Sequence, residues 1–351
     1  MTPSQEPPVL ELGLDTFGDV TAGPDGKRLP QDQVLRNVVA EGVLADQLGL
    51  AFFGVGEHHR DDFSVSAPEV VLAAIAGQTR SIHLGSAVTV LSSDDPVRVF
   101  QRFSTLDAIS NGRAEDILGR GSFTESFPLF GFDLDRYEQL FEEKLQLFAE
   151  ILKEAPVTWK GTTRAALDRQ TVYPQTASGR LRTWVGVGGT PQSVVRAARY
   201  GLPLMLAIIG GDPLAFAPHV ALYRRALEQA GHATLPIGAH SPGYVAETDA
   251  KAREEAFPHH AAMHARIGRE RGWRPMTRSD FEQAAGPAGA LLVGSPDTVA
   301  RKIVRTAKGL GLARFDMKYS MGTMPHEQLL GSIRLYATKV VPLVQEQLAR
   351  S

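Results

Sequence analysis

Short apolar runs alternate with segments of helical spacing along almost the whole chain. Residues 51–55 form an uninterrupted apolar run of the length of a buried strand, and polar side chains follow it directly. Residues 32–48 instead carry apolar side chains at positions 35, 38, 39, 43, 44 and 48, which is the stripe of an amphipathic helix. Eight runs are typical of strands: residues 9–15, 51–55, 82–91, 114–118, 184–187, 202–209, 237–245 and 314–319.

Helical segments separate these runs, at residues 32–48, 68–79, 96–112, 135–153, 191–200, from 212 onward, 297–309 and 325–348. Eight strands that alternate with helices predict an α/β fold, a (β/α)8 TIM barrel, with a doubly wound open sheet as the alternative. The alternation breaks after the seventh strand, so residues 251–290 are expected to form a partly helical insertion. No repeat or low-complexity linker divides the chain, and we expect one domain over residues 1–351.

Composition narrows the classes of function. The net charge is −2, which gives no electrostatic reason to expect nucleic acid or an anionic membrane as a partner. The sequence has no cysteine, so disulfides, thiolate metal sites and thiol nucleophiles are excluded, and a cytoplasmic location is expected. No apolar run approaches the roughly 20 residues of a membrane helix, and residues 1–8 read as a polar tail rather than a signal peptide.

Three predicted strands end in groups that could carry chemistry. Glu57, His58 and His59 follow the second strand, where an imidazole could exchange protons with a ligand or simply satisfy a backbone carbonyl. Residues 119–122 read Gly-Arg-Gly-Ser after the fourth strand, a combination that suits a phosphate but is also common in turns. Residues 186–190 precede a helix whose amino end could hold a phosphate, with a tight turn as the alternative.

Other motifs carry less weight. Residues 186–190 resemble a dinucleotide fingerprint, but Pro191 takes the place of the third glycine, so we reject a Rossmann fold. His260 and His264 lie one helical turn apart without the glutamate of the zinc-protease motif, and no metal site is expected. His240 could face a pocket, although a satisfied core histidine is the default. The chain has neither a G-x-S-x-G sequence nor a Walker A sequence.

Taken in chain order, these residues resemble the bacterial-luciferase-like superfamily of flavin-dependent oxidoreductases. The resemblance covers nearly the whole chain, and the block from 85 to 131 is its most specific part because several fixed residues keep their spacing. The matching segments are residues 57–59, 85–91, 95–98, 106–107, 110, 112–113, 119–121, 130–131, 185–189, 293–296 and 340–342.

The resemblance implies a (β/α)8 barrel that binds a reduced flavin at the carboxyl ends of its strands. In members of the superfamily, the segment that matches Ala87 and Val88 contains a non-prolyl cis peptide beside the isoalloxazine ring. Arg120 matches the arginine that binds the flavin phosphate in those proteins. His58 matches the histidine nearest the reactive edge of the ring, and Glu57 is expected to act with it in catalysis. The cofactor-binding residues so implied are Ala87, Val88, Arg120, Gly121, Gly186, Gly188, Gly189 and Thr190.

Two departures from luciferase bear on function. The reactive cysteine that precedes the arginine in luciferase is Gly119 here, which rules out thiol chemistry and argues against light emission. A serine of luciferase is Gly189 here, so a side-chain contact to the phosphate would become a backbone contact. The long-chain aldehyde substrate is therefore not carried over.

The expected activity is that of a monooxygenase that uses reduced FMN and O2 to oxidise a small organic substrate. A separate flavin reductase would supply the reduced flavin, since no nicotinamide site is visible. The alternatives are an F420- or FMN-dependent dehydrogenase without oxygen chemistry and a non-catalytic flavin-binding protein. FMN is preferred over F420 because of the Glu-His-His motif and the short loop at 92–96. A homodimer is expected, through the apolar helices at 70–75 and 99–109.

Overall fold

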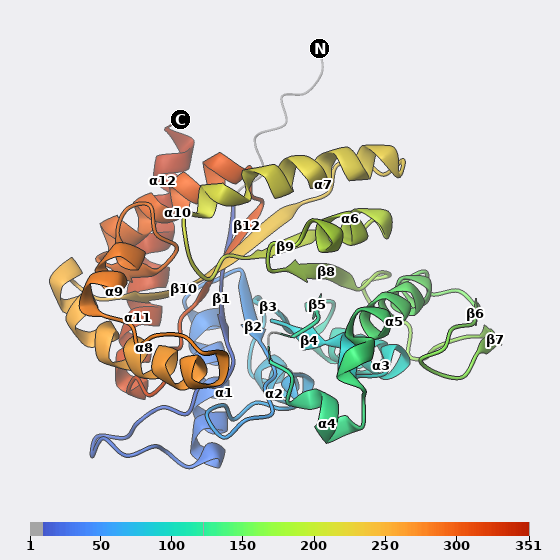
Figure 1. Cartoon of the computed structure of the whole chain (residues 1–351), viewed down its shortest axis with the longest axis horizontal. Coiled ribbons are helices and arrows are strands. Elements are labelled where there is room, and N and C mark those ends of the chain that lie inside the picture. The colour runs from blue at the N-terminus through green and yellow to red at the C-terminus, as the bar shows by residue number, and fades with distance from the viewer. Residues whose placement is uncertain (1–9, 122, 351) are drawn as a thin grey trace.

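The computed structural model describes residues 10–121 and 123–350, and its centre is a closed barrel of eight parallel strands (Figure 1). The barrel closes because β12 pairs with both β10 and β1. The predicted (β/α)8 barrel is therefore confirmed, and the open sheet is excluded. Its strands are β1 Glu11–Thr16, β2 Phe52–Val55, β3 His83–Ser86, β5 Ala114–Gly119, β8 Arg182–Val187, β9 Leu204–Ala207, β10 Ile237–Val245 and β12 Arg314–Lys318.

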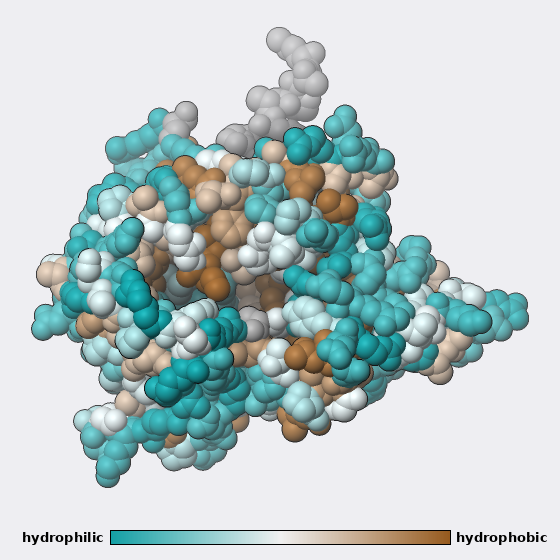
Figure 2. All heavy atoms as spheres, in the orientation of Figure 1, coloured by the Kyte–Doolittle hydropathy of each residue, from teal (hydrophilic) through white to brown (hydrophobic). Residues whose placement is uncertain are grey.

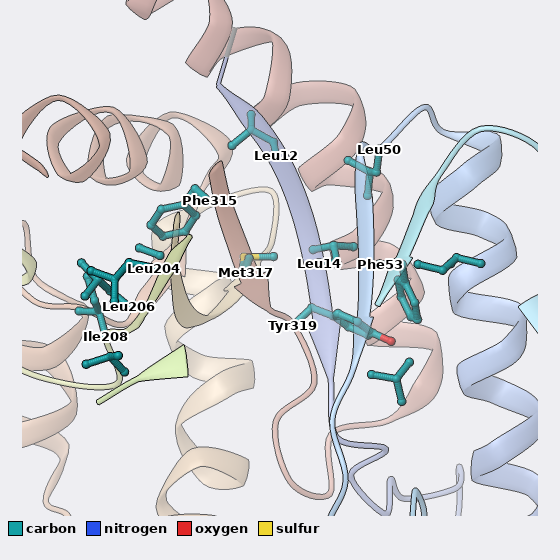
Figure 3. Packing of buried hydrophobic residues seen from close by; sticks show 14 of the residues in the cluster. Leu12, Leu14, Leu50, Phe53, Leu204, Leu206, Ile208, Phe315, Met317 and Tyr319 are labelled. Atoms are coloured by element: carbon teal, nitrogen blue, oxygen red, sulfur yellow. The ribbon is translucent and has the colours of Figure 1, made fainter. Parts of the chain in front are cut away.

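Helices surround the barrel and cover the outward-facing side chains of its strands. Figure 3 shows such side chains on β1 and β12, including Leu12, Leu14, Phe315 and Met317, packed in one buried cluster. Several helices begin with proline, which needs no hydrogen-bond partner in the first turn. The helices are α1 Gln31–Gln47, α2 Pro68–Ala76, α3 Pro96–Ser110, α5 Tyr137–Ile151, α6 Pro191–Arg199, α7 Ala217–Gln229, α10 Pro296–Leu310, α11 His326–Leu335 and α12 Val341–Ala349.

The predicted insertion after the seventh strand is present and is more helical than expected. It contains α8 Asp249–Arg271, which continues through Pro258, and α9 Arg278–Ala285. The insertion ends in β11 Leu292–Gly294, a short strand that the sequence pattern did not reveal. This strand extends the sheet beyond the barrel by pairing in parallel with β10.

Charged and aromatic side chains plug the barrel interior. Arg314 is fully buried, and its guanidinium lies 3.3 Å from the centre of the Phe52 ring. It donates hydrogen bonds to Glu115 (2.6 Å) and Asp316 (2.8 Å). Burial opposes ionisation of Glu115, but the charges of Arg314 and Arg182 and a hydrogen bond with His83 together outweigh it and lower the pKa of Glu115 to about 2. A separate apolar cluster in the barrel comprises Phe52, Ala87, Ile117, Trp184 and Met205.

Some predicted elements differ in detail from the structure. The run at 82–91 is one predicted strand, but the chain breaks it into β3 and β4 Thr89–Val90, followed by a 3-10 turn at Leu91–Ser93. A short antiparallel pair outside the eight predicted strands consists of β6 Val157–Trp159 and β7 Leu167–Gln170. The last predicted helix contains a π-helical turn, Tyr336–Val340, just before Pro342, whose missing N–H disfavours a regular helix.

Two segments considered in the sequence analysis include residues that the structure does not describe. The polar tail at 1–8 and the serine of the Gly-Arg-Gly-Ser motif lie outside the described residues. Within the described residues, no helix is long and apolar enough to cross a membrane.

Candidate active site

The polar groups predicted at strand ends come together at one end of the barrel. Glu57 follows β2, Arg120 follows β5 and Gly188 follows β8, and all these strands run in parallel. Tyr319 follows β12 at the same end, but its hydroxyl points away from the barrel and donates to Glu41 of α1 (Figure 3). These four positions therefore lie at the same end of the barrel. Figure 2 shows one face of the molecule, which is hollowed near its centre and has hydrophobic residues in the recess.

The Glu57 carboxylate is fully engaged by its neighbours. One oxygen accepts a hydrogen bond from the backbone N–H of Val90 (2.5 Å), and the other lies 3.1 Å from Nε2 of His59. The carboxylate therefore connects the turn after β2 to β4 and to the second imidazole. This arrangement suits a residue that positions its neighbours.

His58 lies in a box of aromatic rings. Its backbone N–H donates to the Val65 carbonyl (3.0 Å), which fixes the residue against the returning loop. Its ring is buried, with the rings of Phe17, Phe63 and Phe123 at centroid distances of 4.9, 4.5 and 4.9 Å. Nδ1 of His58 lies 3.6 Å from Oε1 of Glu125. An imidazole held among apolar rings beside one carboxylate can move a proton with little access of water.

Glycines make room for the non-prolyl cis peptide between Ala87 and Val88, which the structure contains as the resemblance implies. A Cβ atom at Gly119 would lie 2.5 Å from Cγ2 of Val88. A Cβ at Gly56 would lie 2.4 Å from the Ala87 carbonyl oxygen, and one at Gly186 would lie 3.2 Å from Cγ1 of Val88. A side chain at Gly56 or Gly119 would therefore force its neighbours to shift, whereas at Gly186 the Val88 side chain would have to give by only a few tenths of an ångström.

Asp116 braces the same segment from the outer side of the barrel. One of its oxygens accepts hydrogen bonds from the hydroxyls of Ser86 (2.6 Å) and Thr89 (2.8 Å), which flank the cis peptide. Burial raises the pKa of Asp116 to about 7, although these hydrogen bonds act to lower it. Sequence reasoning missed this residue; an aspartate inside an apolar strand run was the available signal.

Arg120 lies beside the turn between β8 and α6. Its Nη2 is 3.5 Å from the Thr190 hydroxyl. Thr190 is the N-cap of α6 and makes no side-chain capping bond. The first residue of the helix is proline, which has no N–H, and the third donates its N–H to the Thr190 carbonyl (3.1 Å), so the N–H of Gln192 is left in the first turn for another acceptor. Gly189 has φ of +112°, a conformation that favours glycine, and a Cβ at Gly188 would meet nothing within 4 Å. The sequence-predicted phosphate residues thus lie together.

Gly121 is part of the same edge. Its carbonyl accepts a hydrogen bond from the Tyr137 hydroxyl (3.0 Å), and the Tyr137 ring lies under the Arg120 guanidinium at 5.3 Å. The first turn of α5 therefore supports both residues of the Arg-Gly motif.

A further imidazole, that of His240, lies on β10 beside a carboxylate of β1. Nδ1 of His240 lies 2.9 Å from the buried Asp15 carboxylate of β1. Burial acts to lower the pKa of His240, but the charge and the hydrogen bond of Asp15, together with the charge of Asp316, raise it overall. Sequence reasoning named His240 as a candidate with a structural role as the default, and it did not identify Asp15.

The insertion is tied to the loop after β2. Arg60 donates two hydrogen bonds to Glu270 of α8 (2.7 and 2.6 Å), and Arg266 of α8 lies 2.8 Å from Asp62. The three histidines of α8 have separate environments: His259 contacts Thr323, His260 packs on Phe281, and His264 packs on Trp273.

Comparison with known sequences places the chain among luciferase-like proteins. The model of the luciferase-like monooxygenase family matches residues 15–314. The uncharacterized protein y4vJ of Sinorhizobium fredii is 32% identical over 143 residues, which are 40% of this chain and 41% of that protein. The chain thus matches about two fifths of that relative's length. An alkanal monooxygenase alpha chain of Photorhabdus luminescens is 23% identical over 94% of this chain and 98% of its own length.

Solved structures share the fold along nearly the whole chain. Monooxygenase RslO1 from Streptomyces bottropensis has a TM-score of 0.81 and 26% identity, over 95% of this chain and 99% of its own. The oxygenating constituent of 3,6-diketocamphane monooxygenase from Pseudomonas putida, solved with FMN, has a TM-score of 0.75 and 20% identity, over 95% and 98%. An F420-dependent secondary alcohol dehydrogenase has a TM-score of 0.74 and 16% identity, over 96% and 99%. The family match extends over most of the sequence, and the chain belongs to the luciferase-like monooxygenase family.

Proposed function

We propose that this protein is an FMN-dependent monooxygenase that uses reduced FMN and O2 to oxidise a small organic substrate. The observation that carries the proposal is the placement of Arg120, Thr190 and the amino end of α6 at the same barrel end as His58. A guanidinium, a hydroxyl and the N–H of Gln192 in the first turn of α6 form a donor set suited to a terminal phosphate. A separate flavin reductase would deliver the reduced flavin.

The described residues fit such a flavin. Arg120, Gly188, Gly189 and Thr190 would hold its phosphate, and Ala87 and Val88 would lie against its ring, in the space kept by Gly119 and Gly186. The bound reduced flavin would supply the electrons with which O2 is activated.

The protein's own part in the reaction follows from the site geometry. His58 would donate or accept a proton at a ring nitrogen, and its aromatic neighbours would keep water away from that step. Glu57 would hold His59 and the segment after the cis peptide in place. Loop residues 16–30, the insertion and the end of β12 would shape the pocket for the organic substrate.

An F420-dependent dehydrogenase is the second candidate, because a protein of that activity shares the fold. The two are separated by mixing the protein with reduced FMN and O2, or with F420 and an oxidisable alcohol. Oxygen incorporated into a product supports the monooxygenase, whereas F420 reduction without O2 uptake supports the dehydrogenase. A non-catalytic flavin-binding protein would do neither.

The cytoplasmic location stays a prediction.

Phosphate recognition is tested by Arg120→Ala. Loss of a charge-assisted contact should weaken FMN binding at least about tenfold. Riboflavin lacks the phosphate and should bind with nearly unchanged affinity. Arg169→Ala, on the exposed hairpin strand β7, is the matched control. Equal losses for FMN and riboflavin, measured by quenching of flavin fluorescence, would show that Arg120 has a structural role instead.

A further inference from the structure

The arginine of the candidate phosphate site, Arg120, already forms an ion pair with a carboxylate. Glu138, in the first turn of α5, binds Nη1 of Arg120 through one oxygen. Its other oxygen accepts a hydrogen bond from Nη2 of Arg196 on α6 (3.1 Å). Glu138 therefore bridges two guanidinium groups, only one of which lies against Thr190.

Arg196 has an unpaired hydrogen-bond donor that could bind a second carboxylate oxygen. Nε of Arg196 donates to Glu142 (2.5 Å), but its Nη1 is buried without a hydrogen-bond partner among the described residues. An unpaired buried donor is costly, so Arg196 has capacity for a second carboxylate contact. The Glu138 side chain is 62% exposed, so it has room to move and form this second contact with Arg196.

A phosphate and the Glu138 carboxylate compete for Arg120. The phosphomonoester of FMN carries up to two negative charges near neutral pH, and like charges at contact distance repel. If Glu138 moved its first oxygen from Arg120 Nη1 to Arg196 Nη1, it would bind Arg196 through both oxygens and vacate Arg120. A bidentate carboxylate–guanidinium pair is a favourable geometry.

We propose that Glu138 is an exchangeable occupant of the phosphate site, which binds Arg120 when flavin is absent and moves fully onto Arg196 when flavin phosphate arrives. This proposal rests on the proposed function, because it requires that Arg120 bind the phosphate. Its consequence is a weakened hold on FMN and faster release. That property suits an enzyme that receives reduced flavin from another protein and must discharge oxidised flavin after each turnover.

The decisive variant is Glu138→Gln, which keeps the size of the side chain and removes its charge. FMN should bind about three- to tenfold more tightly and dissociate correspondingly more slowly, because the competing carboxylate is gone. Riboflavin affinity should change by less than about twofold. The measurements are fluorescence titration and stopped-flow displacement of oxidised flavin. Glu150→Gln on the same helix, which removes a carboxylate paired with Lys153, is the matched control and should leave both flavins unaffected.

A second variant tests the receiving arginine. Arg196→Lys keeps the charge but removes the fork, so Glu138 should stay on Arg120 and FMN should bind more weakly. The same substitution in the Glu138→Gln background should have no effect on FMN binding, since no carboxylate then needs to move.

The outcomes separate this proposal from the proposed function. If Arg120→Ala weakens FMN selectively while Glu138→Gln leaves FMN affinity unchanged or weakens it, the exchange is wrong and Glu138 merely orients Arg120. If Arg120→Ala weakens FMN and riboflavin equally, the phosphate does not bind Arg120, and the proposed site fails whatever Glu138 does.

Discussion

The tight contact between Gly119 and Val88 gives a prediction that does not depend on function. In Gly119→Ala, the new Cβ would lie 2.5 Å from Cγ2, 3.0 Å from Cβ and 3.3 Å from Cγ1 of Val88. Carbon atoms prefer separations of about 3.5–4.0 Å. Rotation of the Val88 side chain cannot relieve the contact with its own Cβ. We therefore expect an overpacking cost of about 1–3 kcal/mol in the free energy of unfolding.

A double-variant cycle isolates the contact. Val88→Ala removes both Cγ atoms, so Gly119→Ala combined with Val88→Ala keeps only the 3.0 Å approach to Cβ. The two substitutions should then couple by at least about 1 kcal/mol, with the second rescuing the first. Urea unfolding followed by tryptophan fluorescence measures each free energy, and the buried Trp184 reports on the barrel interior.

Gly188→Ala is the matched control, because a Cβ there meets nothing within 4 Å and the backbone angle is not in the left-handed region. Its stability should stay within about 1 kcal/mol of the original protein, since an unstrained Gly→Ala change acts mainly on the unfolded chain. Equal stability of Gly119→Ala and the original protein, or strict additivity with Val88→Ala, would refute the claim that Val88 demands glycine at position 119.

Three further predictions concern proton transfer, pH and assembly. His58→Asn should bind FMN normally but should lower oxygenated product per flavin oxidised by about 10²–10⁴, with hydrogen peroxide released instead; unchanged coupling would exclude His58 as the catalytic group. The native pKa of Asp116, about 7, lies above its unfolded value of about 3.9, so its stabilising effect is full below about pH 4 and is lost as the pH rises through 7. Thermal unfolding of Asp116→Asn should therefore lack this loss, and an identical pH dependence in both proteins would count against it. The apolar side chains of Val70 on α2 and Ile109 on α3 are 70% and 54% exposed, so light scattering should show a homodimer. The combined substitutions Val70→Glu and Ile109→Glu should weaken this dimer. A species of 38.0 kDa for the unaltered protein would exclude the dimer.

The barrel could be predicted from the sequence because the patterns that indicate its strands and helices involve residues close together in the chain. An apolar run such as 51–55 and a helical stripe such as 32–48 each depend on neighbouring residues, and their alternation determines the architecture. The ends of the strands then fix where Glu57 and Arg120 must lie, because parallel strands share one carboxyl end. The same reasoning failed for β11, which is only three residues long and is held by pairing with β10.

The partners of the site residues were not predictable because they are remote in the chain. Glu138 is 18 residues from Arg120, and Asp15 is 225 residues from His240. No periodicity links such positions; only the closure of the barrel and the packing of α5 and α6 bring them together. Asp116 could have been suspected as a polar residue in an apolar strand, but its hydroxyl partners across the cis peptide could not.

Glu57 and His58 illustrate why adjacency in sequence is a poor guide to roles in a site. Both follow β2 and both were predicted to act in catalysis. The Glu57 carboxylate already has a partner at each oxygen, so removing a proton from a ligand would break contacts that hold His59 and Val90. The His58 ring has one carboxylate neighbour, at 3.6 Å, and otherwise contacts apolar rings. Exchange of a proton at His58 therefore disturbs little of the surrounding structure, and the geometry favours His58 as the group that moves the proton and Glu57 as the group that positions the turn.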